Sequence, residues 1–188
     1  MAHIKHTVSV TAIIEFQGKF LFVRRNPEEG NFGGKWVFPG GKVEMGEDVI
    51  QALFRELDEE VAVEHTDEVA LLTAYQFSRT EDQSSSQGLV FLVRAKSDAV
   101  KLDAESFDAS RWIEPEEIVQ FGDETIYGME VHVRNAVIAL KKNLLLDRNW
   151  LSVTTYQGKH CAMDEDYIRN FSEDVDAALK RQEFFPHR

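Results

Sequence analysis

Four carboxylates fall within five residues of the chain, at Glu56, Asp58, Glu59 and Glu60. The surrounding residues repeat apolar side chains at helical spacing, and like charges three or four positions apart on a helix repel one another. Such a cluster raises the pKa of its own members unless a cation neutralises it. Hard divalent ions, Mg²⁺ above all, bind carboxylate oxygens and keep positions open for water and phosphate oxygens. Metal-dependent chemistry on a phosphate compound is therefore one explanation of this spacing.

Helical geometry divides these four side chains into two groups. At about 100° per residue the apolar side chains share one sector, which we expect to face the core. Glu56, Glu59 and Glu60 fall on a narrow arc at the edge of that sector, whereas Asp58 points to solvent. A solvated charged face is the alternative, and it is the usual explanation of an acidic helix. The predicted core face consists of Ile50, Leu53, Phe54, Leu57 and Val61.

The residues around this helix resemble the Nudix box, whose pattern is G-x5-E-x7-R-E-U-x-E-E-x-G-U, with U an aliphatic residue. The sequence departs from the pattern at Ala62, where the family has glycine. Glycine just past a helix end usually adopts a left-handed conformation, in which alanine costs about 1 kcal/mol. The matching residues are Gly41, Glu47, Arg55, Glu56, Leu57, Glu59, Glu60 and Val63.

The resemblance implies an α/β/α sandwich that hydrolyses a nucleoside diphosphate linked to another group X. It implies that Arg55 orients the carboxylates and that Glu47 holds the loop and the start of the helix. The implied cofactor is Mg²⁺, with Mn²⁺ as an alternative, bound by carboxylates and one backbone carbonyl. The implied metal ligands are Glu56, Glu59, Glu60 and the carbonyl of Gly40 or Gly41.

A general base must take the proton of the attacking water. Glu59 or Glu60 could serve, and so could Glu105 in the stretch "KLDAESFDAS", which has Asp103 and Asp108 as neighbours. An acidic residue in a polar loop is more often simply solvated.

Positive side chains are needed for the remaining charge of a phosphate substrate. Lys42, Arg24 and Arg25 are the candidates, although strand alternation sends only one of the two arginines inward. Trp36 could stack on a base or pack in the core, and we expect Phe38 in the core.

Two segments bear on the substrate. "WVFPGGKVEMGE" looks like the MutT-type hydrolases of nucleoside triphosphates or nucleotide derivatives, which is our leading hypothesis. "RRNPEEGNFGGKW" is similar to the loop before the box in nucleoside diphosphate sugar hydrolases, which are the alternative. The residue arrays that accompany NADH and ADP-ribose hydrolysis are absent. The rival from another class is a catalytically silent nucleotide-binding sensor, which we would expect to have lost some of these carboxylates.

The composition of the chain limits the classes of partner that it can bind. Its 188 residues carry a formal net charge of −12, which argues against general nucleic-acid or membrane-surface binding and leaves a small nucleotide as partner. No apolar run approaches the ~20 residues that span a bilayer, and the first residues lack the apolar core of a signal peptide. With Cys161 as the only cysteine, we expect a cytoplasmic protein without an internal disulfide.

Hydrophobic patterning predicts an α/β fold with a mixed sheet over residues 1–145. A mainly helical extension over 146–188 could form a lid, a homodimer contact or the completion of the core. Two strands are expected around "QGK", and "EDQSSSQG" reads as a flexible connection. Helices are predicted over 47–61, from Pro115, and over 125–145.

Overall fold

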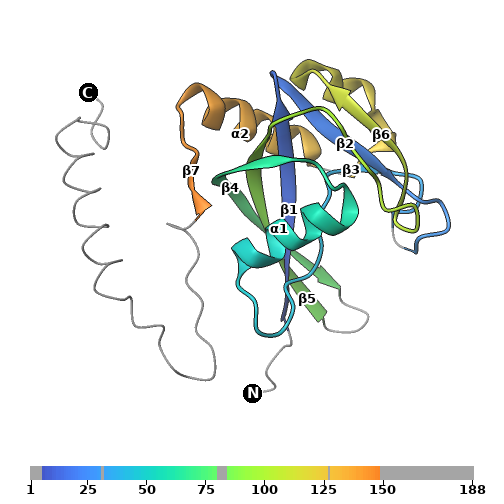
Figure 1. The fold of residues 1–188 in the computed structure, drawn as a ribbon. Helices are drawn as coiled ribbons and strands as arrows, with labels where there is room; N and C mark the ends of the chain where they lie inside the picture. The colour runs from blue at the N-terminus through green and yellow to red at the C-terminus, as the bar shows by residue number, and fades with distance from the viewer. Residues whose placement is uncertain (1–5, 31, 80–83, 127, 149–188) are drawn as a thin grey trace, which may run out of the picture. The chain divides into compact units, whose positions relative to one another are not determined.

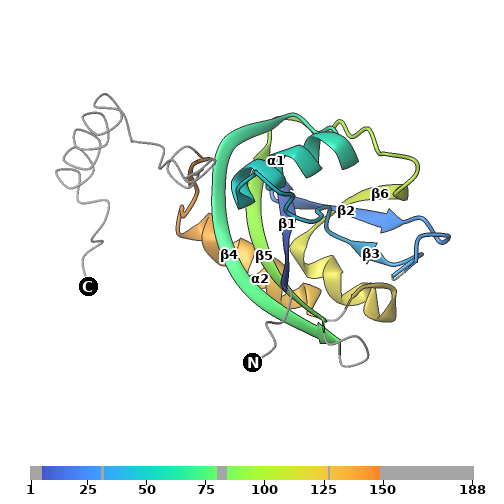
Figure 2. The ribbon, with the colours of Figure 1, turned by 90° about the horizontal axis from the view of Figure 1, so that it is seen from below.

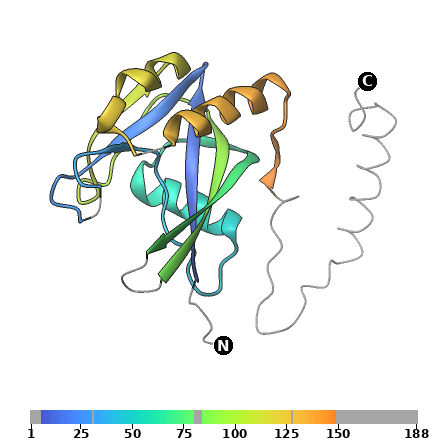
Figure 3. The ribbon, with the colours of Figure 1, turned by 180° about the vertical axis from the view of Figure 1, so that it is seen from behind.

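The computed structural model describes residues 6–30, 32–79, 84–126 and 128–148 (Figure 1). These residues form a seven-stranded mixed sheet with one α-helix on each face. Figures 1 and 3 view the sheet from opposite sides, and each shows a different helix in front. The predicted α/β/α sandwich is thereby confirmed. No helix in these four ranges has the length and apolar character needed to cross a membrane.

Six strands follow the order β3-β2-β1-β5-β4-β7, and β6 also pairs with β2. The β1 and β5 strands run parallel, while the other neighbouring strands are antiparallel. Figure 2 shows the curved β4 strand lying outside β5, on the side of the sheet opposite β2 and β3. The strands are β1 (His6–Phe16), β2 (Lys19–Arg25), β3 (Trp36–Val37), β4 (His65–Arg79), β5 (Ser84–Ala95), β6 (Phe107–Ile113) and β7 (Leu146–Asp147).

The predicted hairpin joins β1 to β2 through Gln17 and Gly18. Both residues have positive φ, at 50° and 85°, as a two-residue turn that matches the twist of its strands requires. The Gly18 N–H donates to the Glu15 carboxylate over 2.8 Å. The turn thus fixes the register of the strand that carries Arg24 and Arg25.

The described part of the polar run, residues 84–88, is a strand and not the flexible connection that the sequence predicts. Residues 84–88 are the first part of β5, and they pair with β1 on one side and β4 on the other. The ring of Tyr75 lies over Gly88, where an added Cβ would come within 2.0 Å of it. Hydrogen bonding to two neighbouring strands therefore outweighs the weak strand propensity of serine and glycine.

The α1 helix (Val49–Glu60) begins at a capping box. The Asp48 carboxylate accepts hydrogen bonds from the Ile50 and Gln51 N–H groups, and the Gln51 side chain accepts one from the Asp48 N–H. Asp58 is exposed, as predicted. The predicted core face is also confirmed, since Ile50, Leu53, Phe54, Leu57 and Val61 are all buried.

Ala62 follows α1 in the left-handed region, with φ of 42°, and its N–H donates to the Leu57 carbonyl. A Cβ in this region costs about 1 kcal/mol, so we expect Ala62→Gly to raise the free energy of unfolding by about that amount. Urea denaturation measures the change, and the melting temperature should rise by about 3 °C. Glu64→Gly, at an exposed position without positive φ, is the control and should not stabilise the protein. A variant at residue 62 that is no more stable than wild type would contradict the prediction.

The α2 helix (Met129–Lys141) covers the other face of the sheet and is shorter than the predicted helix over 125–145. Thr125 forms a β-bridge with Trp36 instead, and Gly128 has φ of 92° at the helix start. The predicted helix at Pro115 is present as a 3-10 helix, and a second one follows. They are η1 (Pro115–Gln120) and η2 (Gly122–Glu124).

The chain divides into two compact units, residues 1–152 and 153–188. The second unit lies outside the described residues, and so do residues 149–188 of the mainly helical extension that the sequence predicts. Within the first unit, β7 pairs with Glu68 and Val69 of β4. A boundary at residue 145, and a lid, dimer or core role for the extension, stay predictions.

Candidate functional site

Arg55 stands at the centre of the acidic helix and uses all five of its N–H donors. Its Nε and one Nη donate to the two oxygens of Glu47, at 3.1 and 2.8 Å. The other Nη donates to Glu56 at 2.9 Å and to Glu59 at 3.0 Å. A further bond reaches the Lys42 carbonyl at 3.0 Å. The carboxylate partners, Glu47 first, raise the pKa of Arg55, so a fixed positive charge aligns three acidic side chains and the preceding loop.

Glu56 lies against Gly41, at the point where the loop from β3 reaches α1. An added Cβ on Gly41 would come within 2.3 Å of a Glu56 carboxylate oxygen. Burial raises the pKa of Glu56, and the Arg55 guanidinium opposes that shift. The missing side chain of Gly41 therefore leaves room for the carboxylate at the edge of the core.

Glu60 reaches the neighbouring glycine, and its carboxylate accepts a hydrogen bond from the Gly40 N–H at 2.6 Å. Burial raises the pKa of Glu60 from its usual value of 4.5 to about 7, although this hydrogen bond lowers it. The charge of Glu56 raises the pKa further, and that of Arg25 lowers it. Glu60 is thus a half-buried carboxylate whose negative charge is only partly compensated.

A hard divalent cation fits these residues, because their donors are all oxygens and their negative charge exceeds the positive charge beside them. Glu56 and Glu59 share one nitrogen of Arg55, whereas Glu60 turns to the Gly40 N–H. In the described ranges, no three His, Cys, Asp or Glu side chains are gathered closely enough to hold a metal ion as they stand. A metal site at these carboxylates therefore stays a prediction.

The two glycines offer a test that separates folding from chemistry. We expect Gly41→Ala to fold, because its Cβ meets only the end of the flexible Glu56 side chain, and to lose at least about 10-fold in kcat by displacing that carboxylate. Gly40→Ala should unfold more readily, since φ is 144° and the Cβ would come within 2.2 Å of the Val10 carbonyl oxygen. Thermal melting together with steady-state rates distinguishes the two. Wild-type rates in a folded Gly41→Ala variant would contradict the placement of Glu56.

Of the predicted phosphate contacts, Arg25 and Lys42 are the two that lie beside the carboxylates. Arg25 acts electrostatically on Glu60, and its Nε is buried without a hydrogen-bond partner among the described residues. Lys42 is exposed and follows Gly41 directly. Arg25 therefore supplies positive charge near Glu60, and Lys42 is next in sequence to the glycine that lies against Glu56.

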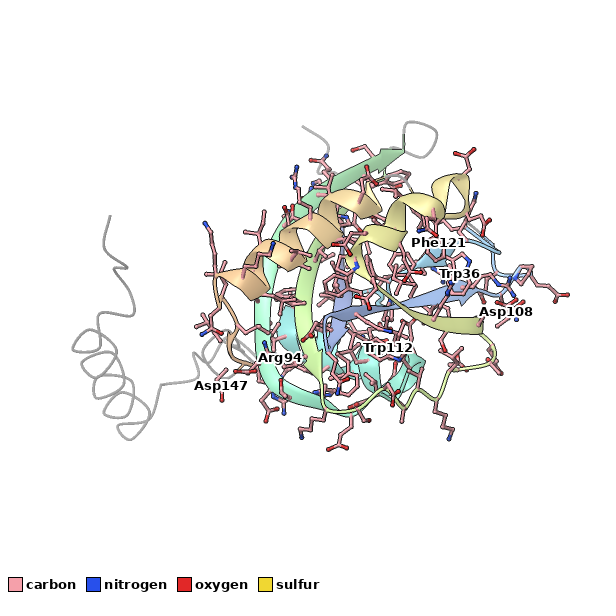
Figure 4. All side chains as sticks on the ribbon, turned by 90° about the horizontal axis from the view of Figure 1, so that it is seen from above. Trp36, Arg94, Asp108, Trp112, Phe121 and Asp147 are labelled. Carbon is pink, nitrogen blue, oxygen red and sulfur yellow. The ribbon has the colours of Figure 1, made fainter. Side chains whose placement is uncertain are left out.

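Arg24 and Trp36 make their contacts elsewhere. Arg24 forms a two-bond ion pair with Asp108 of β6, at 2.7 and 3.0 Å, and lies over the Trp36 ring. Trp36 is half-buried and packs edge-on against Phe121. Figure 4 shows Trp36, Phe121 and Asp108 together at one end of the sheet. The structure does not bring Arg24 or Trp36 to the carboxylates of α1, and it places Phe38 in the core as predicted.

The segment that carries Glu105 is folded against the end of α1. The Asp103 N–H donates to the Glu60 carbonyl at 2.8 Å, and the charge of Asp103 raises the pKa of Glu60. Glu105 itself is exposed. The sequence indicates Asp103 and Asp108 only as neighbours of Glu105. In the structure the Asp103 backbone bonds to the end of α1, and Asp108 belongs to β6. An aspartate three residues before a serine is typical of a turn that the aspartate side chain closes. This local pattern could have singled out Asp103.

Residues 4–129 match the family described as the NUDIX domain. The chain is 36% identical over 112 residues to the CTP pyrophosphohydrolase of Escherichia coli K12, an alignment that covers 60% of this chain and 78% of that protein. It is 29% identical over 122 residues to the nucleoside triphosphatase NudI of Escherichia coli O139:H28, with 60% of this chain and 84% of that protein covered.

Solved structures show the same fold. A MutT NUDIX hydrolase from Burkholderia pseudomallei superposes with a TM-score of 0.60 at 21% identity, covering 70% of this chain and 98% of that one.

Proposed function

The chain belongs to the Nudix hydrolase family, and from that premise we propose that it cleaves a pyrophosphate bond of a nucleoside triphosphate with the help of Mg²⁺. The observation that carries this proposal is the set of carboxylates arranged around Arg55 and the two glycines before α1. The retained acidic residues favour an enzyme over the alternative of a silent nucleotide sensor.

We assign the metal to Glu56, Glu59, Glu60 and the carbonyl of Gly40 or Gly41. Of the two carbonyls, that of Gly40 is the better candidate, because the Gly41 oxygen already accepts a hydrogen bond from the Val10 N–H. A bound Mg²⁺, or Mn²⁺ in its place, would neutralise phosphate charge and lower the pKa of water. Arg55 holds Glu56 and Glu59 in place for it.

The side chains around the metal ligands complete the proposed mechanism. Arg25 and Lys42 bind the phosphate oxygens that carry the remaining substrate charge. A carboxylate takes the proton of the attacking water, and Glu59, Glu60 and Glu105 are the candidates. Among them Glu105 is exposed and has no assigned part in holding the metal.

The substrate class follows from the relatives together with the sequence. Both named relatives act on nucleoside triphosphates according to their names, which agrees with the MutT-like stretch before α1. A nucleoside diphosphate sugar is the alternative, because the loop between β2 and β3 is similar to that of sugar-nucleotide hydrolases.

A substrate panel tests the proposal. CTP, the other nucleoside triphosphates, dinucleoside polyphosphates and nucleotide sugars are assayed with Mg²⁺, and kcat/KM is compared. We expect a nucleoside triphosphate to exceed every nucleotide sugar by at least about 10-fold. A nucleotide sugar as the best substrate would establish the alternative. A protein that hydrolyses nothing in the panel but binds a nucleotide tightly would be a sensor.

A further inference from the structure

The segment from Lys101 to Ser106 joins two parts of the proposed active site. Its first half is bonded to the end of α1, where the Lys101 and Asp103 N–H groups donate to the Val61 and Glu60 carbonyls at 2.9 and 2.8 Å. Its last residue is bonded to the end of β2, where the Asn26 N–H donates to the Ser106 carbonyl at 2.9 Å. The segment therefore spans from the acidic helix to the strand that ends in Arg25.

The Asp103 carboxylate closes a tight turn within this segment. One oxygen accepts hydrogen bonds from the Ser106 hydroxyl at 2.6 Å and the Ser106 N–H at 3.2 Å. The other oxygen accepts from the Glu105 N–H at 3.3 Å. The Phe107 N–H donates to the Asp103 carbonyl at 2.9 Å. Both carboxylate oxygens are thus engaged within the turn, and the Ser106 hydroxyl lowers the pKa of Asp103.

The turn determines where Glu105 stands. Glu105 is exposed, and the described residues give its side chain no hydrogen-bond or ion-pair partner that would orient it. Its backbone is held at one end through Asp103 and at the other through Ser106. The placement of the Glu105 backbone near the end of α1 therefore depends on the three hydrogen bonds that the Asp103 carboxylate accepts.

We propose that Asp103 is a positioning residue for the hydrolysis, which holds Glu105 over the carboxylate end of α1 where it takes the proton of the attacking water. This inference rests on the proposed function and deepens it. Asp103 touches neither substrate nor metal in this role and acts through Glu105. A direct electrostatic action of Asp103 on Glu60 is the competing explanation, and it depends on the charge of Asp103 rather than on the turn.

A double-mutant cycle tests the inference, with CTP and Mg²⁺ as the assay. We expect Asp103→Ala to lower kcat by about 10-fold with KM changed by less than about 2-fold, because a misplaced base affects the chemical step. Glu105→Gln should lower kcat at least as much. The double variant should be no slower than Glu105→Gln alone, since two residues that act as a unit are not additive.

Two further variants distinguish the hydrogen-bonded turn of Asp103 from the effect of its charge on Glu60. Asn also closes such turns, so Asp103→Asn should recover most of the activity lost in Asp103→Ala. Ser106→Ala removes the shortest hydrogen bond of the turn and should show the same non-additivity with Glu105→Gln. This variant provides the test if Asp103→Ala does not fold.

The outcomes that overturn the inference differ from those that overturn the function. Losses of kcat that multiply in the double variant, or an Asp103→Asn variant as slow as Asp103→Ala, would show that Asp103 does not act through Glu105. Neither result would contradict the proposed hydrolase function. A wild-type protein that hydrolyses no nucleotide overturns the proposed function, and this inference with it.

Discussion

Glu60→Gln is expected to lower kcat for nucleotide hydrolysis by at least about 100-fold, as loss of a metal-organising group commonly does. The amide keeps the shape of the side chain and can still accept the hydrogen bond of the Gly40 N–H, but it cannot supply negative charge to a cation. Glu59→Gln is expected to have an effect of the same size. Asp58→Asn is the matched control, because Asp58 lies on the same helix turn and faces solvent. Its rate should equal that of wild type.

The stability of the metal-free Glu60→Gln variant shows whether the variant loses activity because it unfolds. A pKa that rises from 4.5 in the unfolded chain to about 7 in the fold means that the folded state holds its proton more tightly. The fold is therefore favoured at low pH and loses stability as pH rises from about 4.5 to about 7. A glutamine does not titrate, so the variant should lack this decline and be at least as stable as wild type at pH 8. Urea denaturation in a chelator at pH 5 and pH 8 measures both proteins. A less stable variant at pH 8 would contradict the assigned burial of Glu60.

Arg55→Lys should lower kcat by at least about 100-fold although the positive charge is kept. Lysine offers one ammonium in place of a planar fork, so it cannot bind Glu47 with two bonds and still hold Glu56 and Glu59. The carboxylates would then lose the alignment that a divalent cation needs. Steady-state kinetics over a range of Mg²⁺ concentrations should show weaker metal activation as well as a lower maximal rate.

Arg94→Lys is the matched control for that variant. Arg94, on β5, also bridges two carboxylates, Glu15 at 3.3 Å and Glu68 at 3.1 Å, which belong to β1 and β4 and not to the acidic helix. Its replacement should reduce stability while leaving kcat within about 2-fold of wild type. Equal losses of kcat in both variants would indicate that the effect at Arg55 is one of general stability.

Local periodicity was sufficient to predict α1, its core face and the exposure of Asp58. The buried positions of Leu53 and Leu57 and the exposed position of Asp58 follow from helical spacing and from the contrast between apolar and charged residues. Ala62, at the position of a family glycine, has the left-handed backbone that glycine usually adopts just past a helix end. These features depend on residues that are close in sequence, which is why the pattern contains them.

Features that depend on distant partners were not predictable. Residues 84–88 look like a loop by composition, but β1 and β4 supply hydrogen bonds on both sides. Arg24 is a predicted phosphate contact, and the register of β2 with β6 gives it a partner, Asp108, that the sequence did not predict. Asp103 is joined to Glu60 by a bond across 43 positions of the chain. In each case a tertiary contact decides the role of the side chain.

We propose that the carboxylates of α1 hold a divalent cation that is needed to hydrolyse a nucleoside triphosphate. The most direct test follows CTP and its products by phosphorus NMR in ¹⁸O-water, with Mg²⁺ or with a chelator, for wild type and Glu60→Gln. We expect wild type with Mg²⁺ to release CMP and pyrophosphate, with ¹⁸O in one product that identifies the phosphorus attacked. The chelator and the variant should each abolish that turnover. Hydrolysis that continues at the wild-type rate in the chelator or in Glu60→Gln would contradict the account.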